Sequence, residues 1–230
     1  MITLRDVQMS YPLEQSEVQV LQEVNLTIHP GESAAIVGPS GSGKTTLLLL
    51  LAGLDQPTTG SIEIEGTRIS SLSADEMADL RRDRMGIIFQ SFHLIPSLSA
   101  IGNVTLPLEI AGDHDALDKA REMLNRVGLN HRMAHYPNQL SGGEQQRVAI
   151  ARALVHQPPS IFADEPTGNL DKNTGASVSD LLFDLHDNLG TTLVMVTHDP
   201  QMAMRCDRQL HLDEGKLIEK LQGQADARSV

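Results

Sequence analysis

The sequence predicts an α/β protein with a mostly parallel sheet, a small antiparallel β subdomain at the N-terminus and a helical insertion. Strand and helix patterns alternate over residues 142–197, which is typical of a parallel sheet covered by helices. Residues 1–30 instead alternate apolar and polar side chains, as strands with one buried face do. Between these regions, residues 91–140 are rich in turn formers and in helical periodicity, and we expect them to form the insertion.

Two strands are expected at the N-terminus, one containing Ile2 and Leu4 and the other spanning residues 24–28. A polar segment at 12–17 is expected to be the loop between them. Residues 61–65 alternate in the same way. We therefore expect this third strand to join the first two in an antiparallel sheet.

The next segments predict the framework of a strand–turn–helix unit. Pro30-Gly31 is a turn signal, and residues 34–37 form a short apolar run typical of a buried strand. A glycine-rich turn follows, and then a leucine-rich helix that ends near Leu54. A capping box predicts a helix over 73–84, and a further buried strand is expected over 86–89.

The helical insertion contains one clear amphipathic helix, ended by Gly128. Its apolar face consists of Leu117, Ala120, Leu124 and Val127. The elements expected after the insertion are a helix over 142–156, a strand over 160–163, a helix over 174–189, a strand over 192–197 and a hairpin that turns at 213–216. We expect one domain over 1–220, with the helical subdomain at about 91–156, and a disordered tail at 221–230.

Composition excludes several classes of protein. Cys206 is the single cysteine, so there is no internal disulfide framework. The start of the chain lacks the features of a signal peptide, and no apolar run approaches the ~20 residues of a membrane span. We therefore expect a soluble protein in a reducing compartment.

The net charge of −12 argues against nucleic acid as a partner, because nucleic-acid binders present basic patches to phosphates. The densest basic cluster is mixed with acidic residues and is expected to be a solvated helix face. It comprises Arg81, Arg82 and Arg84 together with Asp79 and Asp83.

The glycine-rich turn matches the phosphate-loop pattern, with a buried strand before it and a helix after it. Its glycines allow backbone N–H groups to turn toward phosphates, and the helix start adds partial positive charge. Lys44 is expected to contact the β- and γ-phosphates of ATP, and Thr45 to ligate Mg²⁺. The predicted nucleotide-binding residues are Gly38, Pro39, Ser40, Gly41, Ser42, Gly43, Lys44, Thr45 and Thr46.

Two carboxylates, Asp164 and Glu165, follow a buried strand. Alone, such a pair is more often the start of a loop. Downstream of a phosphate loop, Asp164 is suited to holding Mg²⁺ and Glu165 to polarising the attacking water.

The segment Leu140-Ser-Gly-Gly-Glu-Gln145 has two interpretations. Ser141 and Glu144 form a capping box for the following helix, which is a structural role. A cap does not need consecutive glycines, however, and Gly142 and Gly143 lower helix propensity. They are explained if an anion approaches the backbone. Because one nucleotide would then meet two helix starts, we expect a homodimer in which each copy completes the other's ATP site.

With these motifs, the chain resembles ABC transporter ATPases along nearly its full length. The resemblance implies that Tyr11 stacks on adenine, that Gln90 senses the γ-phosphate and ligates Mg²⁺ with Thr45 and Asp164, and that His198 contacts the γ-phosphate. It implies catalytic roles for Glu165, His198 and Lys44. Residues implied to act across the dimer are Ser141, Gly142, Gly143, Glu144 and Asp171.

The segment 164–171 resembles the subgroup of lipoprotein-release, macrolide-export and FtsE-type ATPases, and 89–96 resembles the YbbA type. The resemblance implies an ATPase subunit that powers a separate integral membrane permease from the cytoplasmic face of the inner (plasma) membrane. The cargo would be hydrophobic or lipid-linked. The alternatives are a soluble ABC ATPase acting on nucleic acid or the ribosome, a phosphate-loop kinase and a pure binding module.

Overall fold

The computed structural model describes residues 1–12 and 16–219, and the expected disordered tail at 221–230 lies outside the described residues. The chain divides into two compact units. The first comprises residues 1–73 and the part of the chain from Val194 onward, and the second comprises Ala74–Leu193.

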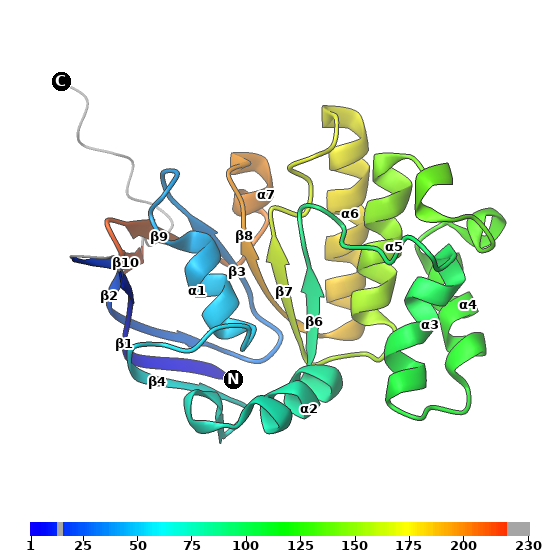
Figure 1. The fold of residues 1–230 in the computed structure, drawn as a ribbon. Coiled ribbons are helices and arrows are strands. Elements are labelled where there is room, and N and C mark those ends of the chain that lie inside the picture. Colours follow the sequence, from blue (N-terminus) through cyan, green and yellow to red (C-terminus); the bar gives the residue numbers. More distant parts are fainter. Residues whose placement is uncertain (13–15, 220–230) are drawn as a thin grey trace. The chain divides into compact units, whose positions relative to one another are not determined.

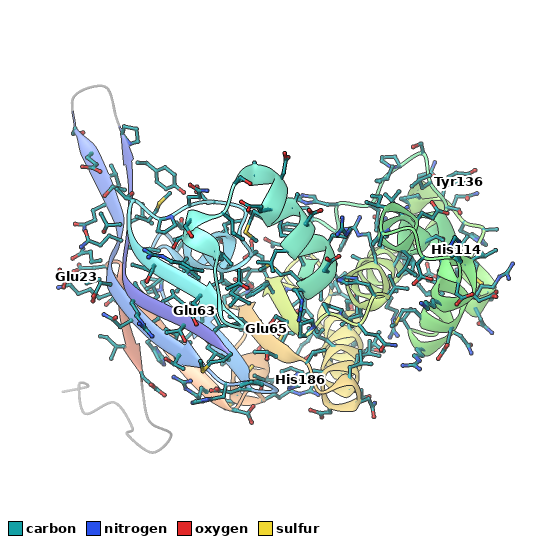
Figure 2. All side chains as sticks on the ribbon, turned by 90° about the horizontal axis from the view of Figure 1, so that it is seen from below. Glu23, Glu63, Glu65, His114, Tyr136 and His186 are labelled. Carbon is teal, nitrogen blue, oxygen red and sulfur yellow. The ribbon has the colours of Figure 1, made fainter. Side chains whose placement is uncertain are left out.

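The first unit contains the expected antiparallel sheet, in the order β2-β1-β4-β5. Strand β1 (Ile2–Pro12) pairs with β2 (Glu17–Ile28) and with β4 (Thr59–Ile64), and β4 pairs with the short β5 (Thr67–Arg68). The predicted apolar positions Ile2, Leu4, Val24, Leu26 and Ile28 are buried, which confirms the alternation there, whereas Val18 near the start of β2 is exposed. Figure 2 labels Glu23, Glu63 and Glu65, three of the acidic side chains that this sheet and its turns carry.

The strand–turn–helix framework also lies in the first unit (Figure 1). Strand β3 (Ser33–Val37) pairs in parallel with β9 (Arg208–Asp213) over its last four residues, and β10 (Lys216–Glu219) is antiparallel to β9. Strand β8 (Thr192–Val196) enters this unit with its last three residues and lies beside β3. The helical elements of the unit are α1 (Lys44–Leu51), the 3-10 turn η1 (Ile69–Ser71) and α7 (Pro200–Met204).

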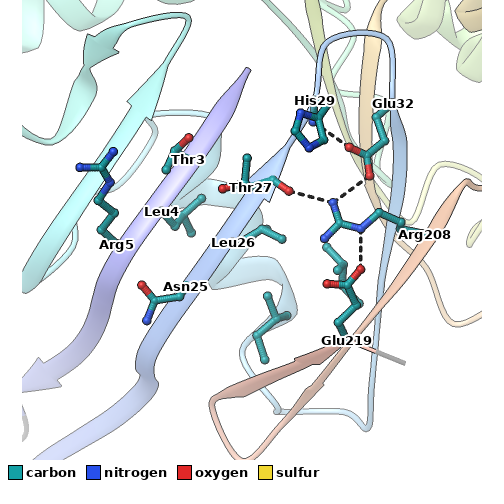
Figure 3. Close-up of a pocket in the computed structure, with 12 residues that line it drawn as sticks. Thr3, Leu4, Arg5, Asn25, Leu26, Thr27, His29, Glu32, Arg208 and Glu219 are labelled. Atoms are coloured by element: carbon teal, nitrogen blue, oxygen red, sulfur yellow. Dashed lines mark hydrogen bonds and ion pairs between the residues drawn. The ribbon is translucent and has the colours of Figure 1, made fainter. Parts of the chain in front are cut away.

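The Arg208 side chain ties the two sheets of the first unit together (Figure 3). Its guanidinium donates to the carbonyl of Thr27 and to Glu32 and Glu219, each at 2.8 Å. These residues line a pocket of about 820 Å³. None of the predicted nucleotide-binding residues lines this pocket, so we assign Arg208 a role in stability.

In the second unit, β6 (Met85–Ile88) and β7 (Ser160–Asp164) form a parallel pair in which Ile88 lies opposite Ala163. Helix α5 (Gly142–Leu154) packs against α3, α4 and α6 (Figure 1). The remaining helices are α2 (Ala74–Arg84), α3 (Ala100–Ile110), α4 (Ala116–Arg126) and α6 (Lys172–Leu189), with 3-10 turns η2 (Asn130–Arg132) and η3 (Pro137–Gln139). No helix in residues 1–12 and 16–219 is long and apolar enough to cross a membrane.

Several elements differ from the expectations. Helix α3 was not predicted, because Gly102 and Pro107 lie inside it; Ser99 caps it by accepting from the Gly102 N–H. The short α7 was also missed. On α4, Leu117 is exposed while Ala120 and Leu124 are buried, so the predicted apolar face is wrong at that position.

The predicted capping box at the start of α5 is formed. The Ser141 hydroxyl accepts from the Glu144 N–H, and the Glu144 carboxylate accepts from the Ser141 N–H at 2.8 Å. The same carboxylate accepts from Arg132 Nε at 2.8 Å. These hydrogen bonds, with that to the Ser141 N–H the largest contribution, hold the pKa of Glu144 below its ordinary value.

A Glu144→Gln substitution tests this cap. The charge stabilises the folded state above the ordinary pKa of about 4.5, and this contribution is lost as pH falls through the lowered value. At pH 7 we expect Glu144→Gln to reduce the free energy of unfolding by about 1 kcal/mol, with the difference from the unsubstituted protein shrinking below pH 4.5. Urea unfolding at several pH values measures both effects.

The control is Glu122→Gln, because Glu122 also pairs with an arginine but is exposed on α4. We expect a change of under ~0.5 kcal/mol for this variant. An effect of Glu144→Gln no larger than that of the control would contradict a stabilising role for the cap.

Candidate functional site

The predicted phosphate loop joins β3 to α1 in the first unit, and its backbone lies close to two neighbouring strands. A side chain on Gly38 would place a Cβ atom 2.0 Å from the Leu212 carbonyl oxygen. On Gly43, which has a φ of +98°, the Cβ would lie 3.0 Å from the backbone and side chain of Val20. Glycine is therefore required at both positions by the packing of the loop itself.

The start of α1 has the properties of an anion site. Its N-cap residue, Gly43, supplies no side-chain hydrogen bond to the first turn. The buried Ser42 hydroxyl has no hydrogen-bond partner in the described part of the chain, and Gly41 faces open space at a φ of +79°. Uncapped N–H groups and the helix dipole favour a negatively charged ligand here. The residues present therefore fit a nucleotide phosphate.

Lys44 is held over this loop by its own backbone. Its Nζ donates to the carbonyls of Gly38 at 3.0 Å and Pro39 at 2.8 Å. An ammonium group has three donors, so the loop orients the lysine and leaves one N–H for a ligand.

Tyr11 lies in the same unit as the loop, near the end of β1. Its hydroxyl donates to Asp55 at 2.8 Å, and 38% of the residue is exposed. Burial and then Asp55 raise the pKa of Tyr11, while a hydrogen bond from the Thr46 side chain lowers it. The structure thus brings the Tyr11 side chain to the first turn of α1.

His198 lies two residues after the end of β8 and is exposed. Its two neighbours fix the turn: the Asp199 N–H donates to the Thr197 hydroxyl at 3.0 Å, and the Asp199 carboxylate caps α7 by accepting from the Gln201 N–H. The turn holds the imidazole outside the core at the carboxyl end of its strand.

In the second unit, Asp164 and Glu165 lie at the end of β7, both half-buried. Glu165 has a φ of +45°, a conformation that costs a non-glycine residue about 1–2 kcal/mol. The Gly168 N–H donates back to the Glu165 carbonyl at 2.9 Å and closes the turn. Such strain is found where a surrounding structure fixes a functional side chain.

Gln90 is brought to the segment that follows these carboxylates. Its Nε2 donates to Asn169 Oδ1 at 3.2 Å, and Asn169 Nδ2 donates to the Gln90 carbonyl at 3.0 Å. Sequence analysis assigned no role to Asn169. A single asparagine within a turn carries no pattern that could have identified this contact.

A second residue that sequence analysis missed is Arg152 of α5. Its guanidinium donates to the carbonyls of Phe92 at 2.9 Å and His93 at 2.6 Å, two residues with positive φ values of 61° and 48°. Burial lowers the pKa of Arg152. In the sequence, Arg152 could have been noticed as the single charged side chain in the apolar helical stretch from Val148 to Leu154.

The residues expected to act across a dimer lie at the starts of α5 and α6. Ser141 and Gly142 are exposed, whereas Gly143 is buried and a Cβ there would lie 2.3 Å from Thr174 Cγ2. Packing of α5 on α6 thus already requires glycine at Gly143. Asp171 caps α6 by accepting from the N–H groups of Asn173 and Thr174. A hydrogen bond from the Thr174 side chain, and then these backbone bonds, lower the pKa of Asp171.

Comparison with known proteins identifies the family and the fold. The family model described as ABC transporter matches residues 21–168. The lipoprotein-releasing system ATP-binding protein LolD of Shewanella denitrificans is 51% identical over 203 residues, which cover 87% of each chain. The uncharacterized ABC transporter ATP-binding protein YbbA of Escherichia coli K12 is 50% identical over 206 residues, covering 89% of this chain and 90% of YbbA.

The fold is shared with a solved ATP-binding cassette, MJ0796, determined as a dimer in a post-hydrolysis state with ADP and Pi bound. The TM-score is 0.88 and the sequence identity 41%, covering 96% of this chain and 98% of the other. The α/β fold predicted from the sequence is thereby confirmed. The chain belongs to the ATP-hydrolysing, nucleotide-binding subunits of the ABC transporter family.

Proposed function

We propose that the chain is the ATPase subunit that powers a separate membrane permease which exports or extracts lipid-linked or hydrophobic cargo. The proposal rests on the phosphate loop and the start of α1. The helix has no side-chain cap, and the loop before it has no room for side chains at Gly38 and Gly43. Family membership assigns ATP hydrolysis to such a site. LolD, at 51% identity, is named for lipoprotein release, which supports the class of cargo.

The phosphate-binding roles follow from the loop geometry. The N–H groups of Gly38 and of residues 40–46 bind the phosphate oxygens, and the remaining donor of Lys44 contacts the β- and γ-phosphates. Mg²⁺ is a hard cation that prefers oxygen ligands and, when bound, would neutralise charge on the phosphates. The Thr45 hydroxyl, the Gln90 amide oxygen and the Asp164 carboxylate offer such ligands.

Glu165 is proposed as the residue that polarises the attacking water, since its turn fixes a carboxylate at the end of β7. His198, held by the turn after β8, is proposed to contact the γ-phosphate together with Lys44. Tyr11 is proposed to stack on adenine.

ATP is proposed to close a homodimer. The start of α5 would then contact the partner's nucleotide through the exposed Ser141 and Gly142, the backbone of Gly143, and Glu144. Asp171 would line the contact between the two copies. The dimeric MJ0796 cassette with bound ADP and Pi supports this arrangement. The subunit would work at the cytoplasmic face of the inner membrane, bound to its permease.

Replacing the proposed base tests the hydrolytic mechanism. Glu165→Gln keeps the side chain's size but removes its ability to accept a proton, so we expect kcat to fall by about 100-fold or more while ATP affinity is retained. Phosphate release and a fluorescent ATP analogue measure the two quantities. Glu109→Gln, an exposed carboxylate on α3, is the control and should leave kcat unchanged. Undiminished turnover in Glu165→Gln would contradict the role given to Glu165.

The transport role is tested by isolating the tagged protein from detergent-solubilised membranes and identifying its partners by mass spectrometry. We expect a stoichiometric integral membrane protein that changes the ATPase rate when reconstituted with the subunit. Recovery only from the soluble fraction, with nucleic acid or ribosomes bound, would overturn the proposal in favour of a soluble ABC ATPase.

A further inference from the structure

We infer that Asn169 is a positioning residue that orients the side-chain amide of Gln90, so that the amide presents its oxygen and not its nitrogen to the cation. The inference rests on the proposed function, in which Gln90 is a ligand of Mg²⁺. It adds a residue outside the predicted site and explains how an uncharged amide is kept in the orientation that a metal needs.

The hydrogen bonds between the two residues determine both amide orientations. The backbone carbonyl of Gln90 can only accept a hydrogen bond, so the group of Asn169 that lies 3.0 Å from it must be the NH₂ group. The Asn169 oxygen therefore faces Gln90, at 3.2 Å from Nε2. Because an amide oxygen only accepts, Gln90 must point its own NH₂ group toward Asn169. The Gln90 oxygen is then directed away from Asn169.

This orientation matters because Mg²⁺ binds oxygen ligands, whereas an amide NH₂ group carries partial positive charge and has no lone pair to donate. An amide free to rotate would present either atom. Gln90 lies two residues after the end of β6, and in the β6–β7 pair Ile88 lies opposite Ala163, the residue before Asp164. The two proposed oxygen ligands of this unit therefore lie near the carboxyl ends of neighbouring parallel strands, with Asp164 as the last residue of β7.

The surroundings hold the pair in place. A Cβ on Gly168 would lie 2.6 Å from Gln90 Nε2, so the Gln90 side chain packs directly on the backbone before Asn169. The Leu170 N–H donates to the Thr167 carbonyl at 3.0 Å and fixes the turn that carries Asn169. On the other side, Arg152 binds the carbonyls of Phe92 and His93, just beyond Gln90.

The experiment measures the affinity of Mn²⁺, a spectroscopic substitute for Mg²⁺, by electron paramagnetic resonance in the presence of a non-hydrolysable ATP analogue. Asn169→Leu keeps the size of the side chain but removes both hydrogen bonds. We expect it to weaken Mn²⁺ binding by about 10-fold, a typical effect of removing a group that orients a metal ligand. Affinity for the analogue without metal should not change.

The control is Asn188→Leu. Asn188 is an exposed asparagine on α6 whose side chain also donates to a backbone carbonyl, that of Asp184, but it has no contact with Gln90. Its Mn²⁺ affinity should equal that of the unsubstituted protein. Melting temperatures identify any variant that fails to fold, and Gly168→Ala, which crowds the Gln90 amide, provides a second perturbation of the same group.

A double substitution separates positioning from a general structural effect. In a Gln90→Ala background there is no amide to orient, so adding Asn169→Leu should cause no further loss of Mn²⁺ affinity. Unchanged Mn²⁺ affinity in both Asn169→Leu and Gly168→Ala would overturn this inference but not the proposed function. Equal losses of Mn²⁺ affinity from Asn169→Leu with and without Gln90 would do the same. Failure of the unsubstituted protein to bind the analogue would instead overturn the proposed function, and the inference with it.

Discussion

The backbone of the phosphate loop is confined between strands, and the candidate chemistry of the first unit depends on this confinement. Gly38 lies against the Leu212 carbonyl of β9 and Gly43 lies against Val20 of β2, with no space for a side chain at either point. The loop therefore has one available path from β3 into α1. That path leaves the first turn of the helix without a side-chain cap, and it brings the Lys44 ammonium group back onto the loop carbonyls.

In the second unit, residues that stabilise the fold also belong to the candidate site. Ser141 caps α5 and Asp171 caps α6, and both were expected at a dimer contact. Gly143 is required by the packing of Thr174, whatever else approaches its backbone. The capping interpretation and the functional interpretation of the segment at 140–145 are therefore compatible. A substitution there changes both stability and the candidate interface, so its effect on activity must be interpreted with its effect on folding.

The sequence allowed prediction of the features that depend on local patterns. Alternation identified the N-terminal strands, and the glycine-rich turn between a strand and a helix identified the candidate phosphate loop. Helix α3 could not be predicted in this way, because Gly102 and Pro107 disfavour a helix locally and its burial against α4 and α5 outweighs that preference.

The contacts made by Asn169 and Arg152 could not be predicted either, because each depends on partners far along the chain. Asn169 bonds with a residue at position 90, and Arg152 reaches the loop that follows it. Neither interaction produces a periodic pattern or a motif in the sequence. Sequence analysis could propose residues with chemical roles, but it could not identify the contacts that these two side chains make.

The central claim is that the backbone N–H groups of the phosphate loop bind the nucleotide. Hydrogen–deuterium exchange of residues 38–46, measured with and without saturating ATP, tests it most directly. We expect slower exchange of these amides when ATP is bound, because each N–H that contacts a phosphate oxygen is withdrawn from solvent. Unchanged exchange in this segment, while ATP protects amides elsewhere in the chain, would contradict it.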